Sequence, residues 1–144
     1  DRLRMIILDT NVVSEPLRPD PDQHVVSWLD AQAVETLYLT TITIAEVRYG
    51  IAALPQGRRR TTLSDRFEGE VLPLFDGRVL SFDEPATREY ASLRSRARSR
   101  GLAIGDLDAL IAGIARAHGH GVASRDVSPF EAAGVRQVVN PFEG

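Results

Sequence analysis

The sequence predicts a three-layer α/β domain whose central sheet is mainly parallel, has five strands and is flanked by helices. Short apolar runs alternate along the chain with longer segments of helical periodicity, and this alternation is typical of parallel sheets. The chain has 144 residues, enough for one domain with a substantial hydrophobic core and too few for two. We therefore expect a single domain over residues 5–144, and interpret residues 1–4, before Met5, as a cloning remnant or an upstream start.

The expected strands are five apolar runs, at 5–9, 37–42, 78–82, 121–124 and 136–139. The segments between them predict five helices, at 22–31, 43–53, 58–72, 85–100 and within 105–121. Prolines precede the first helix, and "LPQG" forms a turn between the second and the third. The fourth helix begins at Pro85 and stops at Gly101, and the fifth ends in glycines, which are the usual boundary residues.

The composition excludes several classes of protein. The chain has no cysteine, which excludes disulfides and thiolate metal sites and predicts a reducing, cytoplasmic compartment. No apolar stretch approaches the roughly 20 residues that cross a bilayer, and we expect no signal peptide. All 17 basic residues are arginine, so no mechanism can use a lysine. The net charge of -3 argues against non-specific binding of polyanions.

Four acidic residues from distant parts of the chain are placed where they could meet. Asp9 ends the first predicted strand, and Asp126 follows the fourth. Glu46 and Asp108 lie in the first turns of predicted helices. Ligands of open parallel sheets bind beyond the carboxyl ends of the strands. A cluster of four carboxylates would repel itself unless protons or cations neutralised it, and all-oxygen ligation favours Mg²⁺ or Mn²⁺ over zinc.

Each acid taken alone also has a purely structural explanation. Thr43 and Glu46 fit a capping box, in which a glutamate at the third helical position bonds back to the N-cap. Asp106 and Asp108 could stabilise the positive end of their helix, and Asp126 could belong to an ordinary turn. These alternatives stay open for single residues, and the combination of acids favours a shared site.

Asp106 and Asp108 cannot both enter one small pocket, because side chains two positions apart on a helix point about 200° away from each other. Asp108 shares a face with Ile111, Ala112 and Ala115, whose apolar side chains we expect to pack against the sheet. We therefore expect Asp108 to be the acid that enters the site.

Four segments, "IILDTNVVSE", "TITIAEVRYG", "GDLDALIAGIA" and "VASRD", follow one another in an order and at intervals that resemble the PIN-domain ribonucleases. Within that family the sequence resembles the VapC toxins of VapBC toxin–antitoxin pairs. The segments "LDTNVVSEPLRP", "VLPLF" and "SFDEPA" are similar to the FitB-like branch. The resemblance extends from about residue 5 to the C-terminal "NPFE" and implies a PIN-like fold.

The resemblance implies a divalent-metal-dependent ribonuclease that acts as the toxin of a type II toxin–antitoxin system. The catalytic acids that it implies are Asp9, Glu46, Asp108 and Asp126. Asp9 and Asp108 would be the metal ligands, for Mg²⁺ or alternatively Mn²⁺. The polar residues that would orient the acids are Thr10, Asn11 and Ser124, the last in place of the usual threonine. Asp106 has no clear counterpart in the family's pattern.

The implied substrate is single-stranded or loop RNA, cut by metal-activated water. Arginines at the rim of an acidic pocket would have to contact the phosphates, and the candidates are Arg48, Arg125, Arg94 and Arg98. We expect the run 94–100 to lie on the surface, with Arg94 and Arg98 on one face of a helix. For the histidines, His24, His118 and His120, we expect roles at helix ends or in solvent. The implied partners are a VapB-type antitoxin and a second copy of the chain, with a larger assembly around the antitoxin left open.

Competing interpretations fail at identifiable residues. A haloacid-dehalogenase phosphatase needs a second acid two positions after Asp9, where this chain has Asn11. A receiver domain needs an active-site lysine, and a P-loop enzyme needs a Gly-Lys-Ser/Thr sequence, and the chain has neither. The alternative that stays open is a non-catalytic PIN-like module that binds RNA or protein without cutting.

Overall fold

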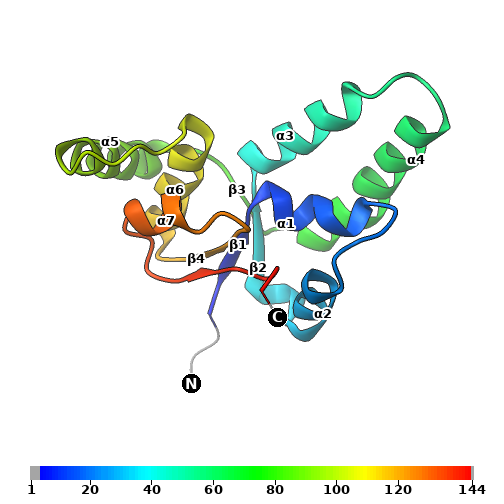
Figure 1. The fold of residues 1–144 in the computed structure, drawn as a ribbon, viewed down its shortest axis with the longest axis horizontal. Coiled ribbons are helices and arrows are strands. Elements are labelled where there is room, and N and C mark those ends of the chain that lie inside the picture. The colour runs from blue at the N-terminus through cyan, green and yellow to red at the C-terminus, as the bar shows by residue number, and fades with distance from the viewer. Residues whose placement is uncertain (1–3, 144) are drawn as a thin grey trace.

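The computed structural model describes residues 4–143, and its centre is a parallel sheet (Figure 1). The strands are β1 (Ile6–Leu8), β2 (Leu37–Thr40), β3 (Val79–Leu80), β4 (Gly121–Ala123) and β5 (Val138–Val139). They lie in the order β3-β2-β1-β4-β5, and each neighbouring pair is parallel. The predicted five-stranded α/β architecture is confirmed. Residues 1–3, part of the predicted remnant, lie outside the described residues.

The described chain contains seven α-helices and several shorter turns. The α-helices are α1 (Thr10–Ser14), α2 (Gln23–Ala31), α3 (Thr41–Ala52), α4 (Arg58–Arg66), α5 (Glu84–Ser99), α6 (Asp106–His118) and α7 (Ser128–Ala132). The shorter turns are η1 (Glu15–Leu17), η2 (Val34–Thr36), η3 (Phe67–Val71) and η4 (Leu72–Phe75). The sequence did not predict α1 and α7, because five residues are too few for a helical period to stand out.

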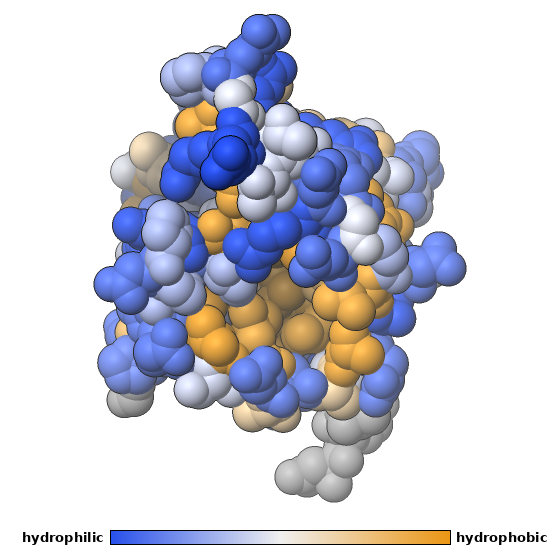
Figure 2. All heavy atoms as spheres, turned by 90° about the vertical axis from the view of Figure 1, so that its right-hand side faces the viewer, coloured by the Kyte–Doolittle hydropathy of each residue, from blue (hydrophilic) through white to orange (hydrophobic). Residues whose placement is uncertain are grey.

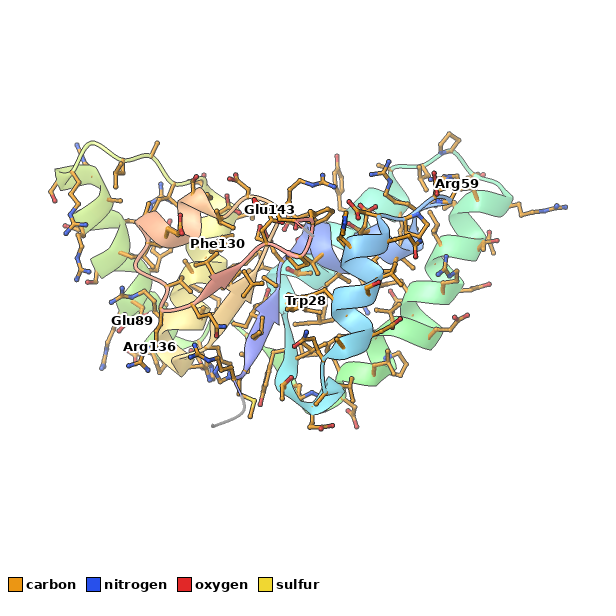
Figure 3. All side chains as sticks on the ribbon, turned by 60° about the horizontal axis from the view of Figure 1, so that its bottom comes forward. Trp28, Arg59, Glu89, Phe130, Arg136 and Glu143 are labelled. Atoms are coloured by element: carbon orange, nitrogen blue, oxygen red, sulfur yellow. The ribbon has the colours of Figure 1, made fainter. Side chains whose placement is uncertain are left out.

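The strand β1 lies in the middle of the sheet and is buried on both faces. Ile7 belongs to one core, with residues of α5, α6 and α7, whereas Ile6 and Leu8 belong to a second core, with residues of α1, α2 and α3. Phe130 packs in the first core and Trp28 against the second, so the two rings lie on opposite sides of the sheet (Figure 3). Because helices cover both faces, the strand is apolar throughout instead of alternating.

The start of α3 differs from the prediction in a way that matters for the site. The strand β2 ends at Thr40, and the helix begins at Thr41, two residues before the predicted start. The N-cap is Thr40, whose hydroxyl accepts the N–H of Thr43 at 3.1 Å. The capping box predicted for Thr43 and Glu46 is therefore wrong, since Glu46 lies beyond the first turn. Its carboxylate is free to serve another purpose.

The helix predicted at 58–72 is also divided. Regular α-helix stops at Arg66, and the chain continues through the π-helical η3 and the 3₁₀ turn η4. Pro73 lies at the start of η4, where its missing N–H rules out continued α-helical bonding. The buried Phe67 and Phe75 anchor this irregular stretch in the core.

The face at the right of Figure 1 carries an apolar patch surrounded by hydrophilic side chains (Figure 2). A hollow of about 280 Å³ lies between α2 and η4, and Pro16, Leu29 and Val34 are among the residues that line it. Leu74, also in the lining, is 56% exposed. None of the helices in residues 4–143 combines the length and the apolar character needed to cross a membrane.

Candidate acidic active site

Asp9 follows β1 directly and lies at the carboxyl edge of the sheet, between β4 and α1. It is the N-cap of α1, and its Oδ1 accepts the backbone N–H of Thr10 at 2.8 Å. Its Oδ2 accepts the hydroxyl of Ser124, from the chain that leaves β4, at 2.7 Å. Burial raises the pKa of Asp9 in spite of these hydrogen bonds, and repulsion from Glu46 and Asp126 adds to the rise.

Thr10 connects the first acid to the second. Its hydroxyl donates to Glu46 Oε1 at 2.6 Å and lies 3.2 Å from the hydroxyl of Thr43. Glu46 is half-buried on α3, one helix away in the fold and 36 residues away in sequence. Because Glu46 does not cap α3, its carboxylate can accept this hydrogen bond. The bond holds the carboxylate at the carboxyl edge of the sheet, where Asp9 lies.

Ser124 and Asn11 connect the first acid to the fourth. Ser124 is fully buried, and its hydroxyl oxygen accepts the N–H of Asp126 at 3.0 Å while donating its hydrogen to Asp9. Asn11 spans the same gap, because its Nδ2 donates to Ser124 at 3.4 Å and its Oδ1 accepts the N–H of Arg125 at 3.0 Å. Asp126 itself is exposed. The loop after β4 is thus tied to α1 through side chains.

Asp108 reaches the same region from the first turn of α6. Its pKa rises to about 6, first because of burial and then because of repulsion from Asp9, Asp126 and Glu46. This carboxylate lies beside the N-cap, Gly105, where a Cβ would be in ordinary van der Waals contact with Asp108 Oδ2, at 3.6 Å. The structure therefore places all four acids within electrostatic reach of one another, at the carboxyl ends of β1 and β4.

Asp106 points elsewhere. Its side chain is 87% exposed, and its Oδ1 lies 3.1 Å from Nη1 of Arg94 on α5. The approach is not aligned for a hydrogen bond, so the contact is mainly electrostatic. Asp106 thus joins the two helices at the surface, whereas Asp108 faces the acids.

The donor set suits a hard divalent cation, because it consists of carboxylates and hydroxyls. Within residues 4–143, no three acidic or histidine side chains already stand in the geometry of a single ion site. Burial first, and then repulsion from the neighbouring acids, raises the pKa values of Asp9 and Asp108. Binding an ion would therefore require the side chains to close around it, and would relieve their repulsion.

The raised pKa of Asp108 predicts a change of stability with pH in the metal-free protein. The folded state binds this proton more tightly than the unfolded state, so the stabilisation is complete below the ordinary aspartate pKa of 3.8 and lost as pH rises through about 6. Because Asp108 is only half-buried, solvent screening reduces the expected effect to about 1 kcal/mol. Urea unfolding in chelator, at about pH 4 and about pH 7, should show Asp108→Asn gaining on the wild type at the higher pH. An equal difference at both pH values would contradict this prediction.

The PIN domain family model matches residues 6–135 of this chain. The chain is a PIN domain. It is 55% identical over 139 residues to the VapC ribonuclease Y4jK of Sinorhizobium fredii, covering 96% of this chain and 99% of that protein. It is 49% identical to the toxin FitB of Neisseria gonorrhoeae, with the same coverage. The family that the motifs predict, including its FitB-like branch, is confirmed.

The fold of this PIN domain also matches a solved structure closely. The structure of FitAcB from Neisseria gonorrhoeae superposes with a TM-score of 0.93 at 48% identity, covering 97% of this chain and 100% of the other. VapBC from Salmonella typhimurium, solved with DNA, has a TM-score of 0.77 at 22% identity, which is a likeness of fold alone.

The arginines predicted to contact RNA lie in different surroundings. Arg48 is exposed on α3 and forms two hydrogen bonds of 2.9 Å with Glu68. Arg94 is half-buried beside Asp106 and Tyr90. Arg98 is exposed one turn further along α5, and Arg94 and Arg98 both line a hollow of about 610 Å³ at the end of that helix. The two residues share a face, as their spacing predicts.

The histidines lie outside the acidic site. His24 pairs with Asp22 at 3.2 Å near the start of α2. His118 ends α6, and His120 precedes β4, so both are at the amino edge of the sheet, opposite the acids. Burial lowers the pKa of His120, with a smaller contribution from His118.

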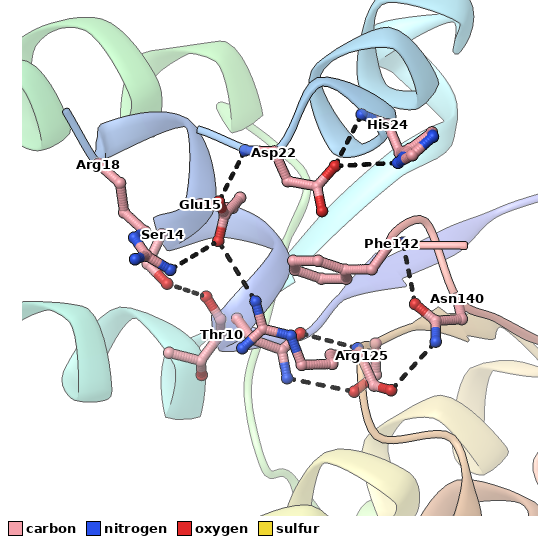
Figure 4. Close-up of polar contacts among 11 residues, drawn as sticks. Thr10, Ser14, Glu15, Arg18, Asp22, His24, Arg125, Asn140 and Phe142 are labelled. Atoms are coloured by element: carbon pink, nitrogen blue, oxygen red, sulfur yellow. Dashed lines mark hydrogen bonds and ion pairs between the residues drawn. The ribbon is translucent and has the colours of Figure 1, made fainter. Parts of the chain in front are cut away.

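The sequence reasoning missed one buried acidic residue close to the site, Glu15. It is 4% exposed, and it lies between the loop after β4 and the start of α2 (Figure 4). Its only signal was the position of an acid two residues after the last valine of "NVVSE".

Proposed function

We propose that this PIN domain is the toxin of a type II toxin–antitoxin pair and a divalent-metal-dependent ribonuclease that hydrolyses RNA phosphodiester bonds. The observation that carries the proposal is the convergence of Asp9, Glu46, Asp108 and Asp126 on one edge of the sheet. That site occurs in a chain similar over nearly its whole length to a VapC ribonuclease and to the toxin FitB.

Asp9 and Asp108 are the residues that we propose hold the ion, with Glu46 and Asp126 completing the acidic cluster. A bound Mg²⁺ or Mn²⁺ supplies an activated water and stabilises negative charge on the phosphate. This division agrees with the burial of Asp9 and the exposure of Asp126, because the buried carboxylate has the greater need of a positive charge.

The surrounding side chains restrict where the acids can point. The hydroxyl of Ser124 holds Asp9, and that of Thr10 holds Glu46. Asn11 connects Ser124 to the backbone of Arg125. Both oxygens of Asp9 and one oxygen of Glu46 accept these bonds, and a carboxylate oxygen can accept more than one, so the acids keep lone pairs for a cation. Such supporting hydrogen bonds orient metal ligands and tune their affinity.

The substrate that we propose is single-stranded or loop RNA. Phosphates that approach an acidic pocket need cations at its rim, and Arg94 and Arg98 line a hollow beside the start of α6, the helix that carries Asp108. Arg48 and Arg125 are further candidates, although both already contact a carboxylate. Such contacts leave some guanidinium donors free for a phosphate.

Replacing both Arg94 and Arg98 with Gln should weaken RNA binding several-fold and flatten its dependence on salt, since each phosphate contact contributes about one unit to the salt slope. Titration of a labelled RNA in calcium, at three salt concentrations, measures the slope. The control is Arg88→Gln, which removes an exposed arginine of the same helix that pairs with Glu84. A slope equal to that of the wild type would contradict a role of this arginine pair in phosphate contact.

The partner that we propose is an antitoxin of the VapB or FitA type. The solved FitAcB and VapBC structures support this by their fold, and the apolar patch beside α2 is the kind of surface that a protein partner covers (Figure 2). We further propose a homodimer in the cytoplasm, in agreement with a chain that has no cysteine.

Removal of the metal tests the function directly. The purified protein should cleave RNA with added Mg²⁺ or Mn²⁺, stop when a chelator is in excess, and recover when the ion is restored. Products mapped at their 5′ ends would reveal a preferred site. Cleavage at an unchanged rate in chelator would contradict the proposed mechanism. Binding of RNA without cleavage under all conditions would favour the non-catalytic module instead.

A further inference from the structure

Glu15 is a buried carboxylate that is not one of the four acids of the cluster. Its side chain is 5% exposed, and its Oε2 accepts the N–H of Asp22 at 2.8 Å. Its Oε1 lies 3.5 Å from a guanidinium nitrogen of Arg18 and 3.5 Å from one of Arg125 (Figure 4). A carboxylate this deeply buried needs oppositely charged partners, and the two arginines provide them.

Arg125 is held by contacts with four residues. Glu15 lies at one side of its guanidinium, and the ring of Phe142 lies 4.1 Å from its Cζ, in a cation–π arrangement. Its backbone N–H donates to Asn11, and its carbonyl accepts Nδ2 of Asn140 at 3.3 Å. The C-terminal turn is itself closed by Asn140, whose Oδ1 accepts the N–H of Phe142 at 2.9 Å. Figure 4 shows these contacts gathered around Arg125.

Of the two neighbours of Arg125 in the chain, Asp126 belongs to the acidic cluster and Ser124 bonds to its member Asp9. Ser124 donates to Asp9 and accepts from Asp126, and Asp126 repels both Asp9 and Asp108. Along this loop Ser124 therefore contacts Asp9, Arg125 contacts Glu15, and Asp126 lies close enough to Asp9 and Asp108 for their charges to repel. A residue that fixes Arg125 consequently determines where the side chains on either side of it can point.

We propose that Glu15 is a positioning residue of the ribonuclease site: by holding Arg125 against Phe142, it keeps Ser124 and Asp126 directed toward Asp9 and Asp108. This inference rests on the proposed function. The side-chain hydrogen bonds and ion pairs of Glu15 within residues 4–143 are with Asp22, Arg18 and Arg125 and with none of the four acids, so its effect on the site passes through Arg125. The C-terminal turn at 140–142 also holds Arg125, through Asn140 and Phe142.

The variant Glu15→Gln separates this role from a purely structural one. The amide oxygen can still accept the N–H of Asp22, and the volume is unchanged, so the protein should fold. Only the charge that attracts Arg125 is lost, and both arginine side chains are more than half exposed and can turn to water. The matched control is Glu89→Gln, which removes an equal charge paired with Arg116 between α5 and α6, away from the loop.

Three measurements form the test. Amide hydrogen exchange at Arg125 and Asp126, whose N–H groups are bonded to Asn11 and Ser124, should become faster in Glu15→Gln and remain slow in the control. The midpoint concentration of Mn²⁺ that raises the melting temperature should increase about tenfold, and kcat should fall about tenfold with KM unchanged, as for residues that support metal ligands. The variant Arg125→Gln should have the same effects on exchange and Mn²⁺, and the double variant should be no worse than either.

The outcomes are distinguishable from those that concern the proposed function. A wild type that fails to cleave RNA with Mn²⁺ refutes the ribonuclease, and the exchange rates then still report whether Glu15 holds the loop. A wild type that cleaves, with Glu15→Gln equal to it in exchange, Mn²⁺ midpoint and kcat, overturns the positioning role. A lower melting temperature alone, with the Mn²⁺ midpoint and kcat unchanged, would also overturn it. Additive losses in the double variant would show that Glu15 does not act through Arg125.

Discussion

Asp9→Asn should reduce cleavage of RNA by more than about a hundredfold. Substituting a residue that only supports a metal ligand already lowers activity by up to about a hundredfold, and we propose that Asp9 is itself a ligand. Asp9 is 5% exposed, and it contacts both the loop after β4 and the start of α1. The substitution preserves size and the acceptor for Thr10, but it removes the negative charge that we propose binds the ion. Initial cleavage rates at saturating Mn²⁺ measure the effect.

The fold should survive this substitution. The raised pKa of the buried Asp9 means that its negative charge is unfavourable in the folded state. Removing this charge should therefore leave the metal-free melting temperature unchanged or raise it. The control is Asp76→Asn, an equal change at an exposed residue after η4. Cleavage by Asp9→Asn at the rate of the wild type would exclude Asp9 from the metal site.

Asp108→Asn should abolish the stabilisation that Mn²⁺ gives to the protein, while Asp106→Asn should keep it. Asp108 is the acid whose pKa is raised to about 6 by burial and by its three acidic neighbours. Its neutralisation should leave the metal-free protein equally stable or more stable by about 1 kcal/mol at neutral pH. A ligand that binds only the folded state raises the melting temperature by mass action, and this rise depends on the intact ligand set.

Asp106 provides the internal control, because it lies two residues away on the same helix and carries the same charge. It is exposed and contacts Arg94, so Asp106→Asn should change stability by less than about 0.5 kcal/mol. Thermal melts of the wild type and both variants, with and without Mn²⁺, decide the assignment. A metal response in Asp108→Asn equal to that of the wild type, or a response lost only in Asp106→Asn, would show that the wrong aspartate was chosen.

Much of the fold could be predicted because the chain's periodicity has few interpretations. Runs such as "MIILD" are short and apolar, as strands buried on both faces are, and their alternation with helical segments indicates a parallel sheet. The boundaries were less predictable where several residues compete for one role. Three threonines at 40, 41 and 43 could each cap α3, and the exit of β2 from the sheet decides for Thr40.

The candidate site was predictable as a set of residue types and not as a set of contacts. Acids at the ends of strands and starts of helices must approach one edge once the sheet is parallel. The hydrogen bond of Thr10 to Glu46 crosses 36 residues, and that of Ser124 to Asp9 crosses 115. Separations of this size leave no local pattern in the sequence. The same holds for the pairing of Asp106 with Arg94, which only the packing of α6 against α5 reveals.

The sequence by itself determined the α/β architecture, the family and the four acids, because periodicity and motif spacing are properties of the chain alone. Only the tertiary structure decided which acids point toward the site and which toward solvent. It also decided which arginines are already paired, and that Glu15 is buried against Arg125. The physical reason is that burial and charge pairing depend on neighbours brought together by folding. An exposed carboxylate and a buried, paired one are the same residue type in the sequence, and only their surroundings in the folded protein distinguish them.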